Sequence, residues 1–341
     1  MRIAFTTSIA LALASCGTHD TPEPEPTAAE PVVPHARATI EVDRYVDGEA
    51  HALMRAAEAL CAEGATHETR RARWREARLH YERIEGAIAV LFPETDADVD
   101  DRYERVAELR ADTDPFDGEG FIGMHAIERV LWGPDVWARE SEGEVVRFES
   151  ALVHFAPPVA LDDTSRARFE AGLCARLVRD LRGMEQTLGS VALDPSTAWR
   201  GVLGSIEEQA EKVRLGTTGQ SESRYAGHTL ADMRGNLEGG LAVLEAFASE
   251  IEALPEGSER LQRLREGFAR LEQAYRASPG EDLPPVPAAF DPDHPSEADR
   301  ATPYGRLFVL LAHESDPEAH RSLAYEVRAT GRAMGIAELG R

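Results

Sequence analysis

The sequence predicts an all-α protein of antiparallel helices packed as up-down bundles, and three observations lead to this fold class. No part of the mature chain alternates apolar and polar residues as a run of strands would. Long segments instead place apolar residues three and four apart, in stretches rich in Ala, Leu, Glu and Arg, which favour helices. Prolines and glycines separate these segments. Short loops between such segments give helical-bundle packing.

The first residues have the layout of a secretory signal. Arg2 provides a positive start, an apolar stretch follows over 3–14, and Leu13-Ala14-Ser15-Cys16 closes it. The stretch is too short for a membrane-spanning helix, and the small residues before Cys16 match the bacterial lipobox. We therefore predict a signal peptide at 1–15 and lipidation of Cys16, with a plain signal peptide as the alternative. The protein would then be anchored on the periplasmic side of a bacterial membrane, and Gly17 leaves the choice between inner and outer membrane open.

A proline-rich tether is predicted over 16–40 and a helical domain over 41–341. Five prolines lie between positions 19 and 36, among Glu and Ala residues that bury little apolar area. The formal charge is −24, and removal of Arg2 with the signal makes it −25. Such an acidic chain disfavours nucleic acid and flat docking on an anionic membrane.

Within the domain, each predicted helix ends at a chemically marked break. The N-cap signals include Asp163-Thr164, and the longest irregular segments are expected at about 134–162 and 278–302. The breaks include Phe92-Pro93, Asp114-Pro115, Gly133-Pro134, Asp194-Pro195 and Leu254-Pro255. The predicted helices cover residues 42–62, 67–92, 98–111, 119–132, 163–188, 196–214, 227–253, 257–276, 303–313 and 317–338.

Two cysteines remain besides Cys16, and both lie in helical patterns. In an oxidising compartment Cys61 and Cys174 could form a disulfide. Two separately buried thiols are an equally good interpretation.

The segment 74–85 places two acidic residues on one helical face. Glu82 and Glu85 are three apart, so their charges repel unless a cation lies between them. Trp74, Tyr81 and Ile84 give the same helix a large apolar surface, which puts at least one glutamate at the edge of a core.

The segment 120–133 carries His125 and Glu128, again three apart, in surroundings that are apolar except for Arg129. Helical bundles build metal sites from such His and Glu pairs. One imidazole with several carboxylates suits iron, and also zinc or copper. For the motif alone, the simpler interpretation is a core histidine hydrogen-bonded to Glu128 without a metal.

The string Gly-Met-His-Ala-Ile-Glu-Arg-Val-Leu-Trp-Gly at 123–133 resembles the signature of the imelysin-like family, also called insulin-cleaving membrane proteases. Within that family it is similar to EfeO-type periplasmic iron-uptake proteins. Further segments agree in order with the EfeO pattern, namely 81–85, 99–102 and 222–239. The resemblance runs from about 42 to 250, with a looser continuation to the C-terminus.

The resemblance implies a domain of two bundle-like halves with a metal site around His-x-x-Glu. Matching positions make His125 and Glu128 ligands, with Glu82, Glu85, Asp100 and Glu222 as carboxylate partners. It also implies an iron-uptake system whose permease and peroxidase would be partners. The chain departs from many EfeO proteins because a proline-rich tether stands where they carry a cupredoxin domain, so copper-assisted redox chemistry is not expected.

The catalytic motifs of peptidases are missing from the sequence. It contains no His-Glu-x-x-His and no Gly-x-Ser-x-Gly, and His313-Glu314 is followed by a proline-containing break. A site rich in carboxylates would also be a weak Lewis acid. We therefore predict a non-enzymatic metal-binding protein, most consistent with iron. The alternatives are a metal-dependent peptidase of the imelysin type and a non-catalytic module that binds a polysaccharide or a partner.

Overall fold

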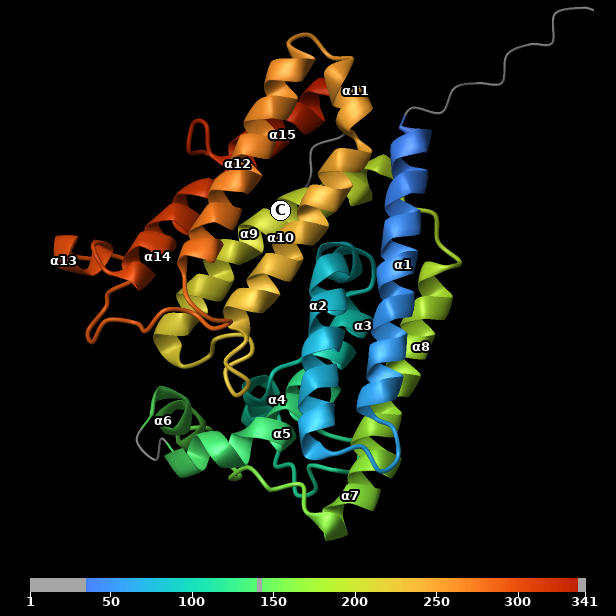
Figure 1. Ribbon diagram of the computed structural model, residues 1–341, viewed down its shortest axis with the longest axis vertical. Helices are drawn as coiled ribbons and strands as arrows, with labels where there is room; N and C mark the ends of the chain where they lie inside the picture. Colours follow the sequence, from blue (N-terminus) through green and yellow to red (C-terminus); the bar gives the residue numbers. More distant parts are fainter. Residues whose placement is uncertain (1–34, 140–142, 337–341) are drawn as a thin grey trace, which may run out of the picture. The chain divides into compact units, whose positions relative to one another are not determined.

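The computed structural model describes residues 35–139 and 143–336, which form helices and loops without a strand (Figure 1). The predicted all-α fold class is confirmed. Residues 35–336 belong to one compact unit that begins at His35. The predicted signal peptide, Cys16 and the tether up to residue 34 lie outside the described residues. Among the described helices, none combines the length and the apolar character needed to cross a bilayer.

The first group of helices surrounds α2. α1 packs along α2 and α8, while α3 contacts α2, α5 and α8. The group consists of α1 (Ala36–Leu60), α2 (His67–Leu91), α3 (Pro93–Asp100), α4 (Tyr103–Leu109), α5 (Gly123–Arg139), α6 (Glu144–Ser150), α7 (Asp163–Phe169), the π-helical segment η1 (Glu170–Cys174) and α8 (Ala175–Leu188).

The second group is built on α9 and α10. α9 packs against α10, α14 and α15, and α12 lies against α10 and α15. α2 also contacts both α9 and α10, and this three-helix contact joins the two groups. The members are α9 (Pro195–Leu215), the 3₁₀ segment η2 (Gly216–Thr218), α10 (Thr229–Ala246), α11 (Ala248–Glu252), α12 (Gly257–Ala277), α13 (Glu297–Arg300), α14 (Pro303–Glu314) and α15 (Leu323–Ala333).

Side-chain caps fix several helix starts. Thr66 accepts from the Thr69 amide at the start of α2, and Asp194 accepts from two amides at the start of α9, where Pro195 follows. α7 begins with a capping box formed by Asp162 and Ser165. The cap therefore lies one residue before the predicted Asp163.

Several predicted boundaries were wrong. α1 begins at Ala36, ahead of the predicted 42, so that residues 36–40 of the expected tether are helical. The predicted helix 98–111 is divided into α3 and α4 by extended backbone at Asp101 and Arg102. The segment 134–162, expected to be irregular, contains the end of α5 and the whole of α6. The predicted helix 317–338 starts only at Leu323, where Ser322 caps α15.

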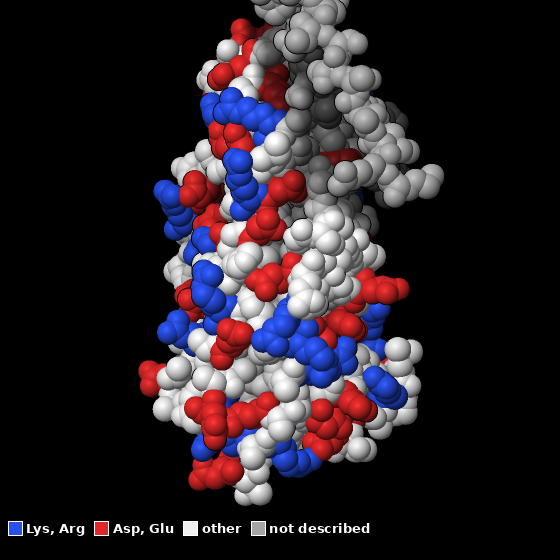
Figure 2. Space-filling model, turned by 90° about the vertical axis from the view of Figure 1, so that its right-hand side faces the viewer, with Lys and Arg blue, Asp and Glu red and all other residues white. Residues whose placement is uncertain are grey.

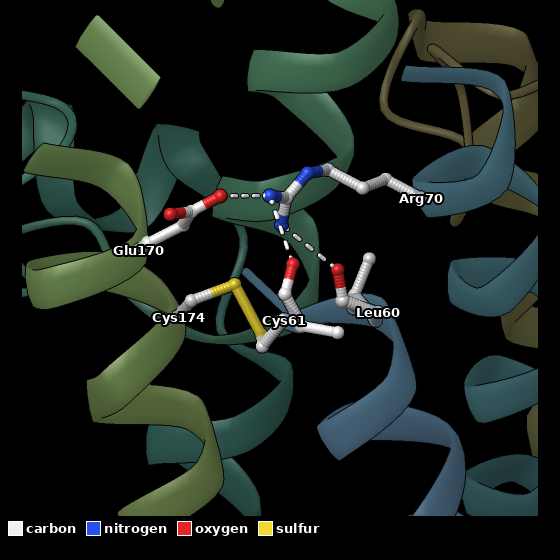
Figure 3. Close-up of a disulfide and its surroundings, with 6 residues drawn as sticks. Leu60, Cys61, Arg70, Glu170 and Cys174 are labelled. Atoms are coloured by element: carbon white, nitrogen blue, oxygen red, sulfur yellow. Dashed lines mark hydrogen bonds and ion pairs between the residues drawn. A yellow bond between two sulfur atoms is a disulfide. The ribbon is translucent and has the colours of Figure 1, made fainter. Parts of the chain in front are cut away.

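A disulfide joins the end of α1 to the π-helical segment that precedes α8 (Figure 3). Cys61, directly after α1, bonds to Cys174 of the π-helical segment, with the two Cα atoms 5.4 Å apart. This decides between the two interpretations of these cysteines. Beside it, the buried Arg70 donates to the Leu60 carbonyl over 2.9 Å and forms an ion pair with Glu170.

The acidic excess is not gathered into one patch on the face that carries α1 and α8. Figure 2 shows acidic and basic side chains interspersed there. Arg37 with Glu41 and Arg182 with Glu58 are examples of such surface pairs. Charge of this kind keeps a protein soluble without marking a docking site.

Candidate metal centre

The centre lies where α2 meets α3, α5 and α9, and all six predicted residues come together there. α2 contributes Glu82 and Glu85 from adjacent turns of one face, and α3 ends at Asp100. α5 contributes His125 and Glu128. Glu222 comes from the connection between η2 and α10. Five of these residues are buried, and the side chain of the sixth, Asp100, is only 9% exposed.

Two close backbone approaches make this convergence possible. Gly123 opens α5 with φ +81°, and a Cβ there would lie 2.4 Å from the Val99 carbonyl oxygen of α3. Gly239 of α10 packs so closely on α2 that a Cβ would lie 2.1 Å from the Arg83 oxygen. The first contact sets His125 beside Asp100, and the second presses α10 onto the helix that carries Glu82 and Glu85.

One side of the His125 ring is firmly held. Its Nδ1 lies 2.9 Å from Glu128 Oε2, and the other oxygen of Glu128 accepts from the amides of Tyr225 and Ala226, each over 2.8 Å. Both oxygens of Glu128 therefore already have partners. Glu128 orients the imidazole, as a carboxylate behind a metal-ligating histidine does.

The other ring nitrogen has no hydrogen-bond partner although it is buried. Nε2 of His125 lies 3.4 Å from Asp100 Oδ1 and 3.4 Å from Glu222 Oε1, and neither contact has hydrogen-bond geometry. A buried nitrogen of this kind is costly unless something binds it. Its position among carboxylate oxygens fits a metal ligand.

Two overlapping sets of side chains could hold a metal ion. Within each set, the ligand atoms lie within 4.8 Å of one another. The first set is Asp100, His125 and Glu222. The second set is Glu82, Glu85 and Glu222. Glu222 belongs to both, so the two sets form one continuous centre.

Two buried cations that the sequence analysis did not predict also enter the centre. Arg78 forms ion pairs with Glu82 and Asp100, and it approaches Glu222 to 3.5 Å. Lys212 places its Nζ 2.7 Å from Glu82 Oε2 and 2.9 Å from Glu85 Oε2. The two cations offset part of the negative charge that burial would otherwise make prohibitive.

The pKa values show that the two cations do not offset burial equally for all carboxylates of the centre. Burial raises the pKa of Asp100 to about 7, even though Arg78 and His125 oppose the shift. Burial and the charge of Glu85 raise the pKa of Glu82 well above its usual range. For His125, burial alone would lower the pKa, but Asp100, Glu128 and Glu222 outweigh it and raise the pKa to about 9. Without another cation, the centre therefore holds protons at neutral pH.

Comparison with known families now adds to this geometry. Residues 38–303 match the family described as Imelysin, which is named as a peptidase family. The chain belongs to the imelysin family. Among curated proteins no sequence matches it. Membership of the imelysin family indicates a metal-related or peptidase-like role, and the buried His and carboxylate groups are able to bind a metal.

The imelysin centre is supported by an outer layer of hydrogen bonds. Asn236 of α10 donates to Glu85 over 2.9 Å and to Glu208 over 2.6 Å. Gln209 in turn donates to Asn236 over 2.9 Å and accepts from Tyr275. These contacts fix the carboxylate of Glu85 from the side of α9 and α12.

A cavity of about 320 Å³ reaches the centre from the side of α3 and α9. Its lining includes Asp100, Glu85 and Glu222 of the centre itself, and Lys212. Most of its other charged residues are acidic: Asp96, Asp101, Glu104, Glu208 and Glu211, against Arg102 and Arg105. A passage of this charge attracts cations and repels anions.

Arg78 and Lys212 each left a signal in the sequence. Arg78 stands four residues before Glu82, and such a pair is read as an exposed helix-surface contact when burial is unknown. Lys212 is the only lysine of the chain, in which every other cationic side chain is an arginine or a histidine. The uniqueness of that lysine was the available clue.

Proposed function

We propose that this imelysin-family protein is a lipid-anchored periplasmic metal-binding protein that captures iron and passes it to a permease. The protein would carry the ion and would catalyse no reaction of a substrate. The Nε2 of His125, buried between Asp100 and Glu222 without a hydrogen bond, is the observation that carries the proposal.

The donor set fits the proposed ion. Asp100, His125 and Glu222 would hold it, with Glu82 and Glu85 as further carboxylates and Glu128 behind the imidazole. Carboxylates with one imidazole suit iron, and they also accept zinc or copper. The raised pKa values of Asp100 and Glu82 support the proposal. They mean that these carboxylates bind protons readily, and a metal ion would supply the same positive charge.

The access cavity suits capture and release. Cations reach the centre through about 320 Å³ of space lined mainly by carboxylates, a volume at the lower end of ordinary small-ligand pockets. The predicted lipid on Cys16 and the proline-rich segment behind it would keep this domain near a membrane permease. Those features, like the peroxidase partner, follow from the sequence and from the EfeO resemblance.

A metal-dependent peptidase is the second candidate, because the imelysin family is named as a peptidase family. Asp100, His125 and Glu222 could act as the three protein ligands of a catalytic zinc site. The cavity that reaches two of these residues, Asp100 and Glu222, is small for a polypeptide and lined mainly by acidic residues and Lys212. This favours a bound ion over a bound peptide.

Metal content tests the proposal. The full chain, purified in detergent and exposed separately to iron, zinc and copper, should retain one ion, and His125→Ala should lose it. His80→Ala is the matched control, since His80 lies on α2, the helix of Glu82 and Glu85, but pairs with Glu49 outside both ligand sets. Equal, negligible binding by all three proteins would make His125 structural and redirect the search to polysaccharide or protein ligands.

Two further assays separate the candidates. Cells that express the wild-type chain should accumulate radioactive iron faster than cells that express His125→Ala. Cleavage of a denatured protein by the metal-loaded wild type, abolished in His125→Ala, would instead establish the peptidase.

A further inference from the structure

Lys212 is the only lysine in the 341 residues, and it lies in the candidate metal centre. Its side chain projects from α9 and is 4% exposed. The other 36 Lys and Arg positions, 37 in total less this one, are all arginine. The chain therefore uses an ammonium group at this place alone.

The ammonium occupies the second of the two ligand sets. Nζ lies 2.7 Å from Glu82 and 2.9 Å from Glu85, the two carboxylates that belong to this set alone. The first set differs, because His125 Nε2 has no hydrogen-bond partner. Lys212 thus pairs with both carboxylates that belong to the second set alone. In the first set Arg78 pairs with Asp100, but the imidazole nitrogen of His125 is left without a hydrogen bond.

An ammonium is the side-chain group that most closely resembles a metal ion in shape. It is a compact point charge with three donors, whereas guanidinium is a planar fork that pairs edge-on with carboxylates. Arg78 uses such a fork to reach Glu82 and Asp100 from within α2. The compact ammonium of Lys212 reaches one oxygen of each of the two carboxylates, which stand three residues apart on a single helix face.

We propose that Lys212 serves as a built-in cation that fills the second ligand set, so that the centre takes one metal ion instead of two. The inference rests on the proposed metal-binding function. Glu222 belongs to both sets. It would bind the metal ion and also lie beside the two carboxylates that Lys212 neutralises. Removal of the ammonium would turn Glu82, Glu85 and Glu222 into a second metal site.

The number of bound ions tests this inference in the full chain. With zinc as the probe, wild type should bind one ion and Lys212→Met two. Glu85→Gln in the Lys212→Met background should return the number to one. Arg214→Met is the matched control, because Arg214 lies two residues further along α9 and its side chain is 50% exposed. It should bind one ion.

The outcomes distinguish the inference from the proposed function. An absence of zinc from the wild type would refute the proposed function, on which the inference rests. A single ion in Lys212→Met, with helical content equal to wild type by circular dichroism, would overturn the inference.

A measurement on the wild type covers the case in which Lys212→Met does not fold. Lysine labelled with ¹⁵N at Nζ gives one side-chain signal, because the chain has one lysine. The buried, ion-paired ammonium should exchange slowly with water, and it should remain protected after one equivalent of zinc is added. Loss of that protection would show that the metal expels Lys212 from Glu82 and Glu85, which would overturn the inference.

Discussion

At the scale of the residue, the orientation of the His125 ring depends on the carboxylate of Glu128. One oxygen of Glu128 meets Nδ1, and the other accepts from the amides of Tyr225 and Ala226. Because the carboxylate can only accept, it requires a proton on Nδ1 and leaves Nε2 as the nitrogen that can bind a metal.

Glu128→Gln should therefore weaken metal binding about 10- to 100-fold, the usual effect of losing such an orienting group. Glutamine offers one acceptor and one donor, so either Nδ1 or the two amides would face an NH₂ group. Isothermal titration with zinc measures the change. Glu281→Gln is the control, since Glu281 contacts the other buried histidine, His228. Unchanged affinity in Glu128→Gln would contradict the orienting role.

The pKa of His125 predicts how metal binding depends on pH. Since that pKa is raised to about 9, the imidazole is protonated at neutral pH, and a metal ion must displace the proton. The apparent affinity for zinc should therefore rise about tenfold per pH unit below pH 9 and level off above it. Asp100, with a pKa of about 7, should steepen the rise below neutrality.

Titration in buffers of different ionisation enthalpy should find at least one proton released per ion at pH 7. An affinity that stays constant between pH 6 and 8 would refute the prediction.

Sequence reasoning identified the candidate ligands better than the cations that pair with them. Spacing of three residues placed Glu82 with Glu85 and His125 with Glu128 on shared helix faces, and the structure brings both pairs together. Asp100 and Glu222 were accessible only through the family resemblance, because neither has a partner nearby in the chain. Lys212 approaches its carboxylates across about 130 residues of sequence, and periodicity contains no information on such contacts.

At the scale of the element, local signals located the helices and tertiary contacts moved their ends. Pro134 was expected to end a helix, yet α5 continues to Arg139. In the turn that this proline interrupts, the Leu131 carbonyl accepts from His67 and Arg71 of α2. Pro134 removes the helical donor of the Val130 carbonyl, and these side chains of α2 hold the carbonyl next to it. A single sequence does not reveal such help.

The junction between α3 and α5 gives a prediction at this scale. Gly123→Ala should destabilise the fold by about 1–3 kcal/mol, because alanine is strained at φ +81° and its Cβ would clash with the Val99 oxygen. It should also weaken zinc binding, since α5 and His125 would have to move away from Asp100. Urea unfolding and zinc titration measure the two effects.

Gly183→Ala in α8 is the control for that variant. Its Cβ would meet nothing within 4 Å, so alanine should raise the free energy of unfolding by about 0.5–1 kcal/mol and leave zinc binding unchanged. If the two alanine variants behaved alike, the close contact of α3 with α5 would not position His125.

At the scale of the whole molecule, one covalent bond and one polar centre tie distant segments together. The disulfide connects the end of α1 to the segment that precedes α8. The centre connects α2, α3, α5 and α9 through buried ion pairs. The all-α class followed from periodicity, composition and marked breaks, but the contact of α2 with α10 depends on Gly239, whose closeness to α2 no local pattern predicts.

The disulfide leads to the last prediction. It closes a loop of 113 residues, and cross-links of about that length lower the entropy of the unfolded chain by the equivalent of roughly 4–5 kcal/mol. The Cys61→Ser/Cys174→Ser double variant should therefore unfold at a clearly lower urea concentration than wild type. Reductant should lower the midpoint of the wild type and leave that of the variant unchanged.

Because Arg70 still holds the Leu60 carbonyl and pairs with Glu170, the variant should retain its native helical content before unfolding (Figure 3). A midpoint equal to that of oxidised wild type would mean that these packing contacts, and not the covalent bond, hold the end of α1 in place.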